Sequence, residues 1–280
     1  MLAACHLAPD GDSLGSLSAL AALLGEHGHE AVLYNPDPIP RALRFLPYMA
    51  KLVHKLPKET AFDLTIVVDV GDRALLGDRF PGREISGPLL VLDHHASARP
   101  FGDLFICDPA ASSVGVLVAR LAAQLGWTIS PTAALGIYTS IVADTGSFRF
   151  ANTNAEAFRL AADLVEHRAV NPAMIAEQLG ERVPLARWKL LAAALSAIEL
   201  ELEQRVAILI VTKDMLDAAG ANWEDSEGFA NYARAIDTVR CGVLLTPARG
   251  GGIRASMRSV LANSPCERAK FRSKRGFITR

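Results

Sequence analysis

Histidine and aspartate residues recur through the first half of this 280-residue chain at spacings typical of a metal site. They occur in four short segments: His6-Leu7-Ala8-Pro9-Asp10-Gly11-Asp12, Val67-Val68-Asp69, Asp93-His94-His95 and Ala143-Asp144-Thr145-Gly146. Most of these segments come where an apolar run ends, and open α/β sheets bind ligands at the carboxyl ends of their strands. Carboxylates crowded into one place would repel one another unless a cation neutralised them. The pattern therefore predicts a metal cluster.

The first segment has the spacing H-x-x-x-D-x-D, in which a strand ends at His6 and a turn then presents Asp10 and Asp12. Two aspartates separated by one residue can point into a common site while each binds a different ion. Asp69, which ends another apolar run, could bridge both ions. Imidazole and carboxylate ligands together suit Mn²⁺, Fe²⁺, Co²⁺ or Zn²⁺ better than Ca²⁺.

The composition favours a folded cytoplasmic protein of one or two domains. Half of the residues are hydrophobic and 21% are charged, so the chain can bury a large core. No apolar run reaches the roughly 18 residues needed to span a bilayer, and the N-terminus lacks the features of a signal peptide. The four cysteines form no C-x-x-C pair and are expected to be reduced. We therefore expect no membrane association and a cytoplasmic location.

The net charge of −1 hides an uneven distribution along the chain. Residues 267–280 contain six basic side chains and one acidic one, whereas residues 1–266 carry a net charge of −6. An acidic body fits long duplex nucleic acid poorly, because phosphate contacts dominate that binding. A small anionic substrate met by a metal is easier to accommodate. The basic tail is either a solvated terminus or a nucleic-acid-binding segment.

Apolar runs and helical periodicity alternate along the first half of the chain. The expected strands are Leu2–Leu7, Glu30–Tyr34, Asp63–Val68 and Leu89–Leu92. The expected helices are Leu14–His27 with Ser13 as its cap, Ser113–Leu125, Thr132–Ala143 and Ala155–His167. Strands that alternate with helices predict an α/β fold with a doubly wound, mostly parallel sheet.

The second half starts with a long helical stretch, Pro184–Glu203, after which the α/β pattern begins again. Its expected elements are a strand at Val206–Val211, a helix at Asp214–Ala219 and strands at Val239–Thr246 and Gly252–Met257. This restart predicts a second, smaller α/β domain. The expected organisation is a catalytic domain at 1–165, a helical connector at 166–204 and a substrate-binding domain at 205–280.

The four motifs, in this order, resemble those of the DHH phosphoesterase superfamily. Two segments of the second half, Glu227–Tyr232 and Gly251–Ser259, resemble the DHH-associated C-terminal domain. Within the superfamily, the chain is most similar to the bacterial bifunctional oligoribonuclease (nanoRNase) and pAp phosphatase branch, which is NrnA-like. The resemblance implies a hydrolase that trims short oligoribonucleotides as an exonuclease and dephosphorylates 3′-phosphoadenosine 5′-phosphate (pAp).

The resemblance also implies a role for each motif residue and two bound divalent cations, for which we expect Mn²⁺. One ion would be held by His6, Asp10 and Asp69, and the other by Asp12, Asp69, His94 and Asp144. Asp93 would orient an imidazole from behind the ligands, and His95 would face the scissile phosphate. The expected catalytic residues are therefore His95 and Asp69. The residues expected to grip the remainder of the substrate are Arg254, Ser256, Arg258 and Ser259.

The chain departs from the family pattern at both ends. Family members commonly have a helix before the first strand and a G-G-G-H motif after the R-S step, whereas here Gly250-Gly251-Gly252 precedes Arg254. We therefore expect a truncated or frame-shifted second domain. Asn152 and Thr153, after the Asp144 motif, are either turn residues or site-lining ones.

Other functions stay open on the sequence alone. The same metal site would serve an exopolyphosphatase or a cyclic-dinucleotide phosphodiesterase. A metal-binding but catalytically impaired nucleotide-binding protein would also fit the altered C-terminal segment. The expected partners are short single-stranded oligoribonucleotides or small phosphorylated nucleotides, and a homodimer is a further expectation.

Overall fold

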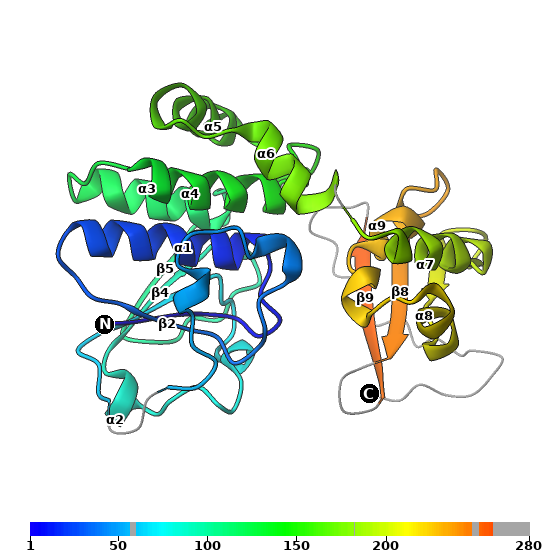
Figure 1. Cartoon of the computed structure of the whole chain (residues 1–280), viewed down its shortest axis with the longest axis horizontal. Helices are drawn as coiled ribbons and strands as arrows, with labels where there is room; N and C mark the ends of the chain where they lie inside the picture. The colour runs from blue at the N-terminus through cyan, green and yellow to red at the C-terminus, as the bar shows by residue number, and fades with distance from the viewer. Residues whose placement is uncertain (57–59, 182, 248–251, 260–280) are drawn as a thin grey trace. The chain divides into compact units, whose positions relative to one another are not determined.

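The computed structural model describes residues 1–56, 60–181, 183–247 and 252–259. The chain forms two compact units, Met1–Arg182 and Val183–Arg280 (Figure 1). The expected connector at 166–204 is thus divided between the two units. The basic tail at 267–280 and most of the glycine turn at 250–252 lie outside the described residues.

The first unit contains a parallel sheet of five strands, which confirms the expected α/β fold. The strands are β1 (Leu2–Cys5), β2 (Val32–Tyr34), β3 (Thr65–Val68), β4 (Leu89–Asp93) and β5 (Leu104–Cys107). Their order is β2-β1-β3-β4-β5, and every neighbouring pair is parallel. All residues of β1 and β3 are buried, as expected for continuous apolar runs in a parallel sheet.

The strand order places a topological switch point between β1 and β3. From β1 the chain passes to β2 at one edge, and from β2 it crosses to β3 on the other side of β1. Parallel sheets with this arrangement bind ligands in the crevice beside the carboxyl ends of the two strands. His6 follows β1 and Asp69 follows β3, so both residues lie at that crevice.

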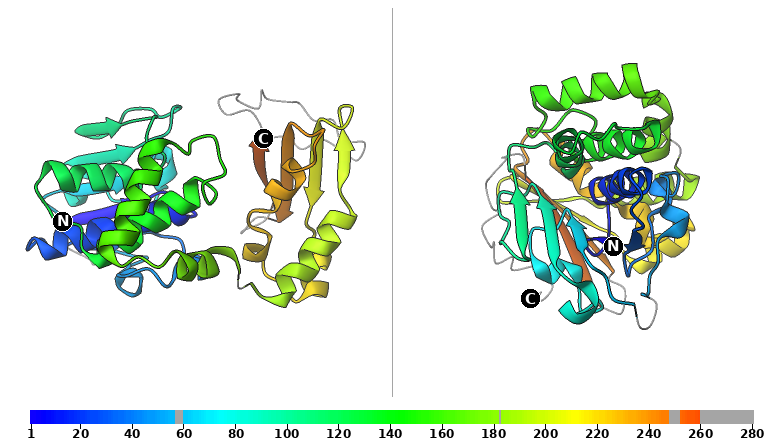
Figure 2. Two further views of the ribbon diagram at one scale, coloured as in Figure 1. Left: turned by 90° about the horizontal axis from the view of Figure 1, so that it is seen from above. Right: turned by 90° about the vertical axis from the view of Figure 1, so that its left-hand side faces the viewer.

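Four long helices accompany this sheet. They are α1 (Gly11–Glu26), α3 (Val114–Gln124), α4 (Pro131–Asp144) and α5 (Ala155–Arg168). The first three are stacked on one face of the sheet, and α5 lies outside them against α4 (Figures 1 and 2). The shorter segments are α2 (Arg83–Ser86), α6 (Pro172–Ala176), a π turn at Glu177–Glu181 and 3₁₀ turns at Arg41–Leu43, Met49–Lys51 and Arg73–Leu76.

Glycines allow the backbones of α1 and α4 to touch. A Cβ atom added at Gly15 would lie 2.6 Å from the carbonyl oxygen of Gly136. One added at Gly136 would lie 2.5 Å from the carbonyl oxygen of Gly15. A side chain at either position would therefore push the helices apart. This contact brings the first turn of α1 next to the last turns of α4.

Helix α1 begins at Gly11, three residues before the expected start, and its N-cap is Asp10 rather than Ser13. The Asp10 carboxylate accepts a hydrogen bond from the Ser13 amide at 3.1 Å, and the Ser13 hydroxyl accepts one from the Asp10 amide at 2.9 Å. This reciprocal capping box satisfies amide groups at the helix start. Asp12 consequently lies in the first helical turn and not in a loop.

The second unit contains a mixed sheet of four strands, which confirms the expected smaller second domain. Its strands are β6 (Glu199–Glu201), β7 (Val206–Ile210), β8 (Cys241–Pro247) and β9 (Ile253–Ser259), in that order across the sheet. Its helical segments are α7 (Leu185–Ser196), α8 (Lys213–Ala219), α9 (Phe229–Arg234) and a 3₁₀ turn at Trp223–Ser226. Only the central pair, β7 and β8, is parallel. Leu190, Leu209, Phe229 and Leu244 are among its buried core residues.

The prediction of one long helix at 184–203 is wrong, because α7 ends at Ser196 and the chain then forms β6. β6 pairs antiparallel with β7 through a tight turn in which Leu202, Glu203 and Gln204 all have positive φ. Leucine and glutamate favour helices, so tertiary pairing overrides local propensity here. No helix among the described residues is long and apolar enough to cross a membrane.

The contact between α1 and α4 gives a stability prediction. Gly15→Ala should lower the free energy of unfolding by about 1–3 kcal/mol, because the new methyl group overpacks the interface. Gly25→Ala in the same helix is the matched control, since its Cβ would meet only the Tyr48 hydroxyl at 3.8 Å. That control should be neutral or stabilising by up to about 1 kcal/mol. Chemical denaturation of both variants measures the difference, and equal effects would contradict the close approach.

Candidate metal centre

The first group of expected ligands comes together at the ends of β1 and β3. The Nε2 atom of His6 lies 3.6 Å from Oδ1 of Asp10 and 3.3 Å from Oδ2 of Asp69. The His6 Nδ1 atom is 2.7 Å from the carbonyl oxygen of Leu7. A carbonyl only accepts hydrogen bonds, so Nδ1 carries a hydrogen, and Nε2 is the atom that could bind a cation after losing its own proton.

The second group joins β4 to the first turn of α1 and the last turn of α4. The Nε2 atom of His94 lies 3.4 Å from Oδ2 of Asp12 and 3.6 Å from Oδ2 of Asp144. The other ring nitrogen, Nδ1, is 3.0 Å from the carbonyl oxygen of Ala111. His94 is thus oriented, like His6, by a hydrogen bond from Nδ1 to a backbone carbonyl oxygen, and its Nε2 atom is directed at the carboxylates.

These residues form one continuous cluster. Among the described residues, three sets have possible ligand atoms that all lie within 4.8 Å of one another: His6–Asp10–Asp69, Asp12–His94–Asp144 and Asp69–His94–His95. Asp69 and His94 each belong to two of the sets. The cluster therefore offers ligands for more than one cation, and Asp69 links the set at His6 to the set at His94 and His95.

Asp69 has the properties of a side chain built to hold a cation. Its side chain is 3% exposed, and its Oδ1 atom has no hydrogen-bond partner among the described residues. Its backbone is left-handed, with φ of 61°, a strained conformation that clusters at functional sites. A buried carboxylate oxygen without a donor is costly unless a cation accepts its charge. The residues present therefore fit a metal centre.

Asp93 orients His95 rather than His94. Asp93 is fully buried, and its Oδ1 atom lies 2.8 Å from Nδ1 of His95. The same hydrogen bond, although burial opposes it, raises the pKa of His95 to about 9. The side chain of His95 is 49% exposed, so its remaining nitrogen, Nε2, is the atom available to a ligand.

The charges of the cluster shift the pKa values of its members in opposite directions. Burial favours neutral His6, but hydrogen bonds to Asp10 and Asp69 outweigh it and raise the pKa of His6 to about 12. Burial likewise favours neutral Asp10, but the His6 hydrogen bond holds the pKa of Asp10 near 2. Burial and the charge of Asp69 raise the pKa of Asp12. Burial, and to a smaller extent the negative charge of Asp69, raises the pKa of Asp144 to about 6. Cation binding would release such protons.

Two further residues, both asparagines, donate hydrogen bonds to members of the cluster. The Nδ2 atom of Asn152 lies 2.8 Å from Oδ2 of Asp144 and 2.9 Å from the carbonyl oxygen of Ser112. Asn152 is therefore a site-lining residue. Asn35, which the sequence analysis missed, is fully buried and donates to the carbonyl oxygen of His6 at 2.7 Å. Its position directly after an expected strand and before a proline was the available signal.

The residues expected to grip substrate lie on β9 of the second unit. Arg254, Ser256 and Arg258 pair with Thr246, Leu244 and Gly242 of β8 and share one face of the sheet. Ser259 lies on the opposite face, so the four residues do not form a single row. Arg254 and Arg258 are exposed. Their role in substrate binding stays a prediction.

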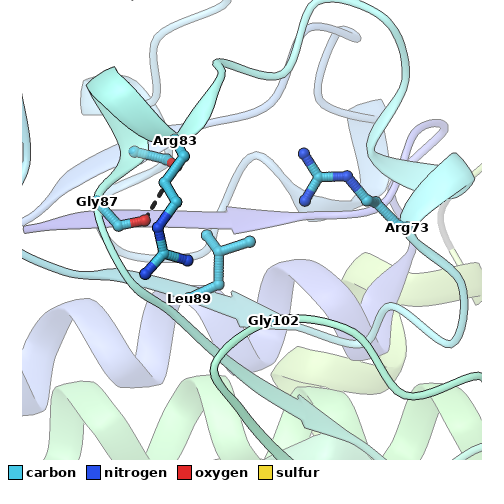
Figure 3. Close-up of a pocket in the computed structure, with 6 residues that line it drawn as sticks. Arg73, Arg83, Gly87, Leu89 and Gly102 are labelled. Atoms are coloured by element: carbon cyan, nitrogen blue, oxygen red, sulfur yellow. Dashed lines mark hydrogen bonds between the residues drawn. The ribbon is translucent and has the colours of Figure 1, made fainter.

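A cavity of about 170 Å³ in the first unit is separate from the cluster (Figure 3). Its lining residues are Arg73, Arg83, Ser86, Gly87, Leu89 and Gly102, none of which is a candidate ligand. The guanidinium of Arg83 is already paired with both carboxylate oxygens of Asp103, at 2.7 and 2.8 Å. We therefore place the functional site at the cluster and not at this cavity.

Comparison with known proteins shows the family of the chain. The model of the DHH family N-terminal domain matches residues 1–171. The bifunctional oligoribonuclease and PAP phosphatase NrnA of Thermus thermophilus is 33% identical over 259 residues, which is 91% of this chain and 75% of that protein. The protein of the same name from Bacillus subtilis is 34% identical over 58% of this chain and 51% of its own length.

A solved structure supports the fold independently. An exopolyphosphatase-related protein from Bacteroides fragilis superposes with a TM-score of 0.86 at 24% identity, covering 95% of this chain and 81% of that one. The family match defines the class of the protein as a DHH phosphoesterase, and the cluster at the switch point of its sheet offers carboxylate and imidazole groups that could hold a metal. The chain belongs to the DHH family and is an enzyme of that family.

The raised pKa of Asp144 gives a pH prediction for the metal-free protein. A carboxyl group whose pKa is raised on folding favours the folded state while it is protonated. This contribution is present below the ordinary carboxyl pKa near 4 and is lost as the pH rises through about 6. The melting temperature of the wild type minus that of Asp144→Asn should therefore decrease as the pH is raised from 4 to 7. A difference that is constant over this range would contradict the assignment.

Proposed function

We propose that the protein hydrolyses short oligoribonucleotides to 5′-mononucleotides and pAp to AMP and phosphate, using two divalent cations. The observation that carries this proposal is the cluster in which Asp69 is shared between two sets of carboxylate and imidazole ligands. The substrate class is supported by the names of the Thermus thermophilus and Bacillus subtilis relatives. The cytoplasmic location and the homodimer stay predictions from the sequence.

Each ligand receives a role under this proposal. His6, Asp10 and Asp69 hold one ion, and the second ion is held by Asp12, Asp69, His94 and Asp144. We take Mn²⁺ as the cation, since mixed imidazole and carboxylate ligands suit it. When bound, a pair of such ions supplies a hydroxide nucleophile near neutral pH and stabilises the attacking and leaving oxygens of an in-line displacement.

The protein's own residues orient and protonate the reacting groups. We assign to Asp69, whose Oδ1 atom is buried without a hydrogen bond and lies 3.7 Å from Nδ1 of His95, the role of orienting the attacking water. His95, held at Nδ1 by Asp93, presents Nε2 to a phosphate oxygen or to the leaving group. With a pKa of about 9, His95 is an imidazolium at neutral pH and can donate its proton there.

We assign the recognition of the rest of the substrate to the second unit. Arginine forms strong, charge-assisted hydrogen bonds with phosphate oxygens. Arg254 and Arg258 supply such groups, and the hydroxyls of Ser256 and Ser259 are candidate additional donors. This assignment corresponds to a catalytic domain at 1–165, a connector at 166–204 and a substrate-binding domain at 205–280.

The shared carboxylate gives the direct test of activity. Asp69→Asn should lower the rate on pAp and on a two-nucleotide RNA at least a hundred-fold, at about the scale on which loss of a key catalytic group acts. Asparagine tolerates left-handed backbone, so the variant keeps the local conformation. Asp163→Asn on the exposed face of α5 is the control and should be fully active.

The outcomes of this assay separate the competing functions. Product formation that needs Mn²⁺, in the wild type and in the control only, supports the proposal. A preference for polyphosphate or cyclic di-AMP would replace the substrate class while keeping the reaction. Nucleotide binding without turnover by folded, metal-loaded protein would overturn the proposed activity in favour of a binding role.

The pair formed by Asp93 and His95 gives a prediction for the pH profile. In the wild type, kcat should fall at alkaline pH as His95 loses its proton, because the hydrogen bond to Asp93 raises the pKa of His95, while bound cations would lower it from its metal-free value. In Asp93→Asn the hydrogen bond to an anionic partner is gone, so this upper limit should move to lower pH. Rate measurements from pH 6 to 10 report the shift, and identical upper limbs would exclude His95 as the proton donor.

A further inference from the structure

Asp12 is the candidate ligand with the most complete set of hydrogen-bond donors. Its side chain is 2% exposed, and its Oδ1 atom is 2.6 Å from the hydroxyl of Ser140 and 3.1 Å from the hydroxyl of Ser16. The amide of Val114 lies 3.1 Å from Oδ1 and 3.0 Å from Oδ2. Oδ1 is thus enclosed by donors, whereas Oδ2 faces Nε2 of His94 at 3.4 Å.

The hydrogen of the Ser140 hydroxyl has two possible acceptors, Oδ1 of Asp12 at 2.6 Å and the hydroxyl oxygen of Ser113 at 2.9 Å. The amide of Gly115 donates to the Ser140 oxygen at 2.9 Å. An ionised carboxylate is a stronger acceptor than a hydroxyl, and the Ser113 hydroxyl can donate to Ser140 in turn. We therefore assign the Ser140 hydrogen to Asp12. This hydrogen bond fixes the rotation of the Asp12 carboxylate about its Cβ–Cγ bond.

The packing of three helices places Ser140 at this point. Ser140 lies on α4 and is fully buried. A Cβ atom added at Gly15 of α1 would lie 3.1 Å from the Ser140 Cβ, and one added at Gly115 of α3 would clash with the Ser140 hydroxyl. Both glycines are needed for the hydroxyl to reach Asp12. The position of Ser140 is therefore a product of the fold and not of the local sequence.

We propose that Ser140 is a positioning residue that turns the Asp12 carboxylate so that Oδ2 faces the ion held with His94 and Asp144. This inference rests on the proposed two-ion function. Ser140 is too deeply enclosed to contact substrate, and it acts only through Asp12. Loss of its hydroxyl should weaken binding of this one ion by about 10- to 100-fold, the range found when a residue that orients a metal ligand is removed. The ion held by His6, Asp10 and Asp69 should be unaffected.

The test is a Mn²⁺ titration of metal-free protein, followed by the electron paramagnetic resonance signal of unbound Mn²⁺. Wild-type protein should bind two ions, and Ser140→Ala should bind one of them with wild-type affinity and the other 10- to 100-fold more weakly. Ser18→Ala is the matched control. Ser18 is also fully buried on α1, but it donates to the carbonyl oxygen of Pro47 at 2.8 Å and does not contact Asp12. This control should bind both ions as the wild type does.

A double variant separates positioning from a general structural effect. In an Asp12→Asn background, Ser140→Ala should cause no further loss of Mn²⁺ affinity, because the group through which it acts is already changed. Equal losses with and without the Asp12 carboxylate would overturn the inference, and so would unchanged binding of both ions by Ser140→Ala. If Ser140→Ala does not fold, Ser16→Ala removes another donor to the same oxygen and should show a smaller loss at the same ion.

Failure of the underlying function gives a different result from failure of this inference. Wild-type protein that binds fewer than two Mn²⁺ ions contradicts the proposed two-ion function. Wild-type protein that binds two ions, with Ser140→Ala identical to it, contradicts only the role of Ser140.

Discussion

The mutual repulsion of buried aspartates at the carboxyl end of the sheet is the constraint on which the structure of the site depends. Asp12 and Asp69 are at most 3% exposed, so solvent does little to screen their charges. Asp12 is stabilised by hydroxyl and amide donors, whereas Oδ1 of Asp69 has no donor among the described residues. Oδ1 of Asp69 is thus a buried acceptor that a bound cation would satisfy.

The fold meets this constraint with two backbone features. The switch point between β1 and β3 brings the segments after both strands to the same crevice, which supplies His6, Asp10 and Asp69. The glycine contact between α1 and α4 brings Asp12 within reach of Ser140 and Asp144. One half of the cluster therefore depends on sheet topology and the other half on helix packing.

The parts of the site beside apolar strands could be predicted from the sequence, because β1 and β3 are buried runs directly followed by His6 and Asp69, and β4 is a mostly buried run that ends at Asp93. The parts that depend on distant partners could not. β5 is a short edge strand with half-exposed residues, and β6 forms only by pairing with β7. Ser140 sits in the middle of a helix, where nothing in the local pattern separates it from an ordinary core serine.

The central claim is that two cations share the Asp69 carboxylate, and anomalous diffraction from crystals grown with Mn²⁺ tests it most directly. The account predicts two peaks per chain, one beside His6 and Asp10, the other beside Asp12, His94 and Asp144, both within coordination distance of Asp69. A single peak, or two peaks of which only one contacts Asp69, would contradict the claim.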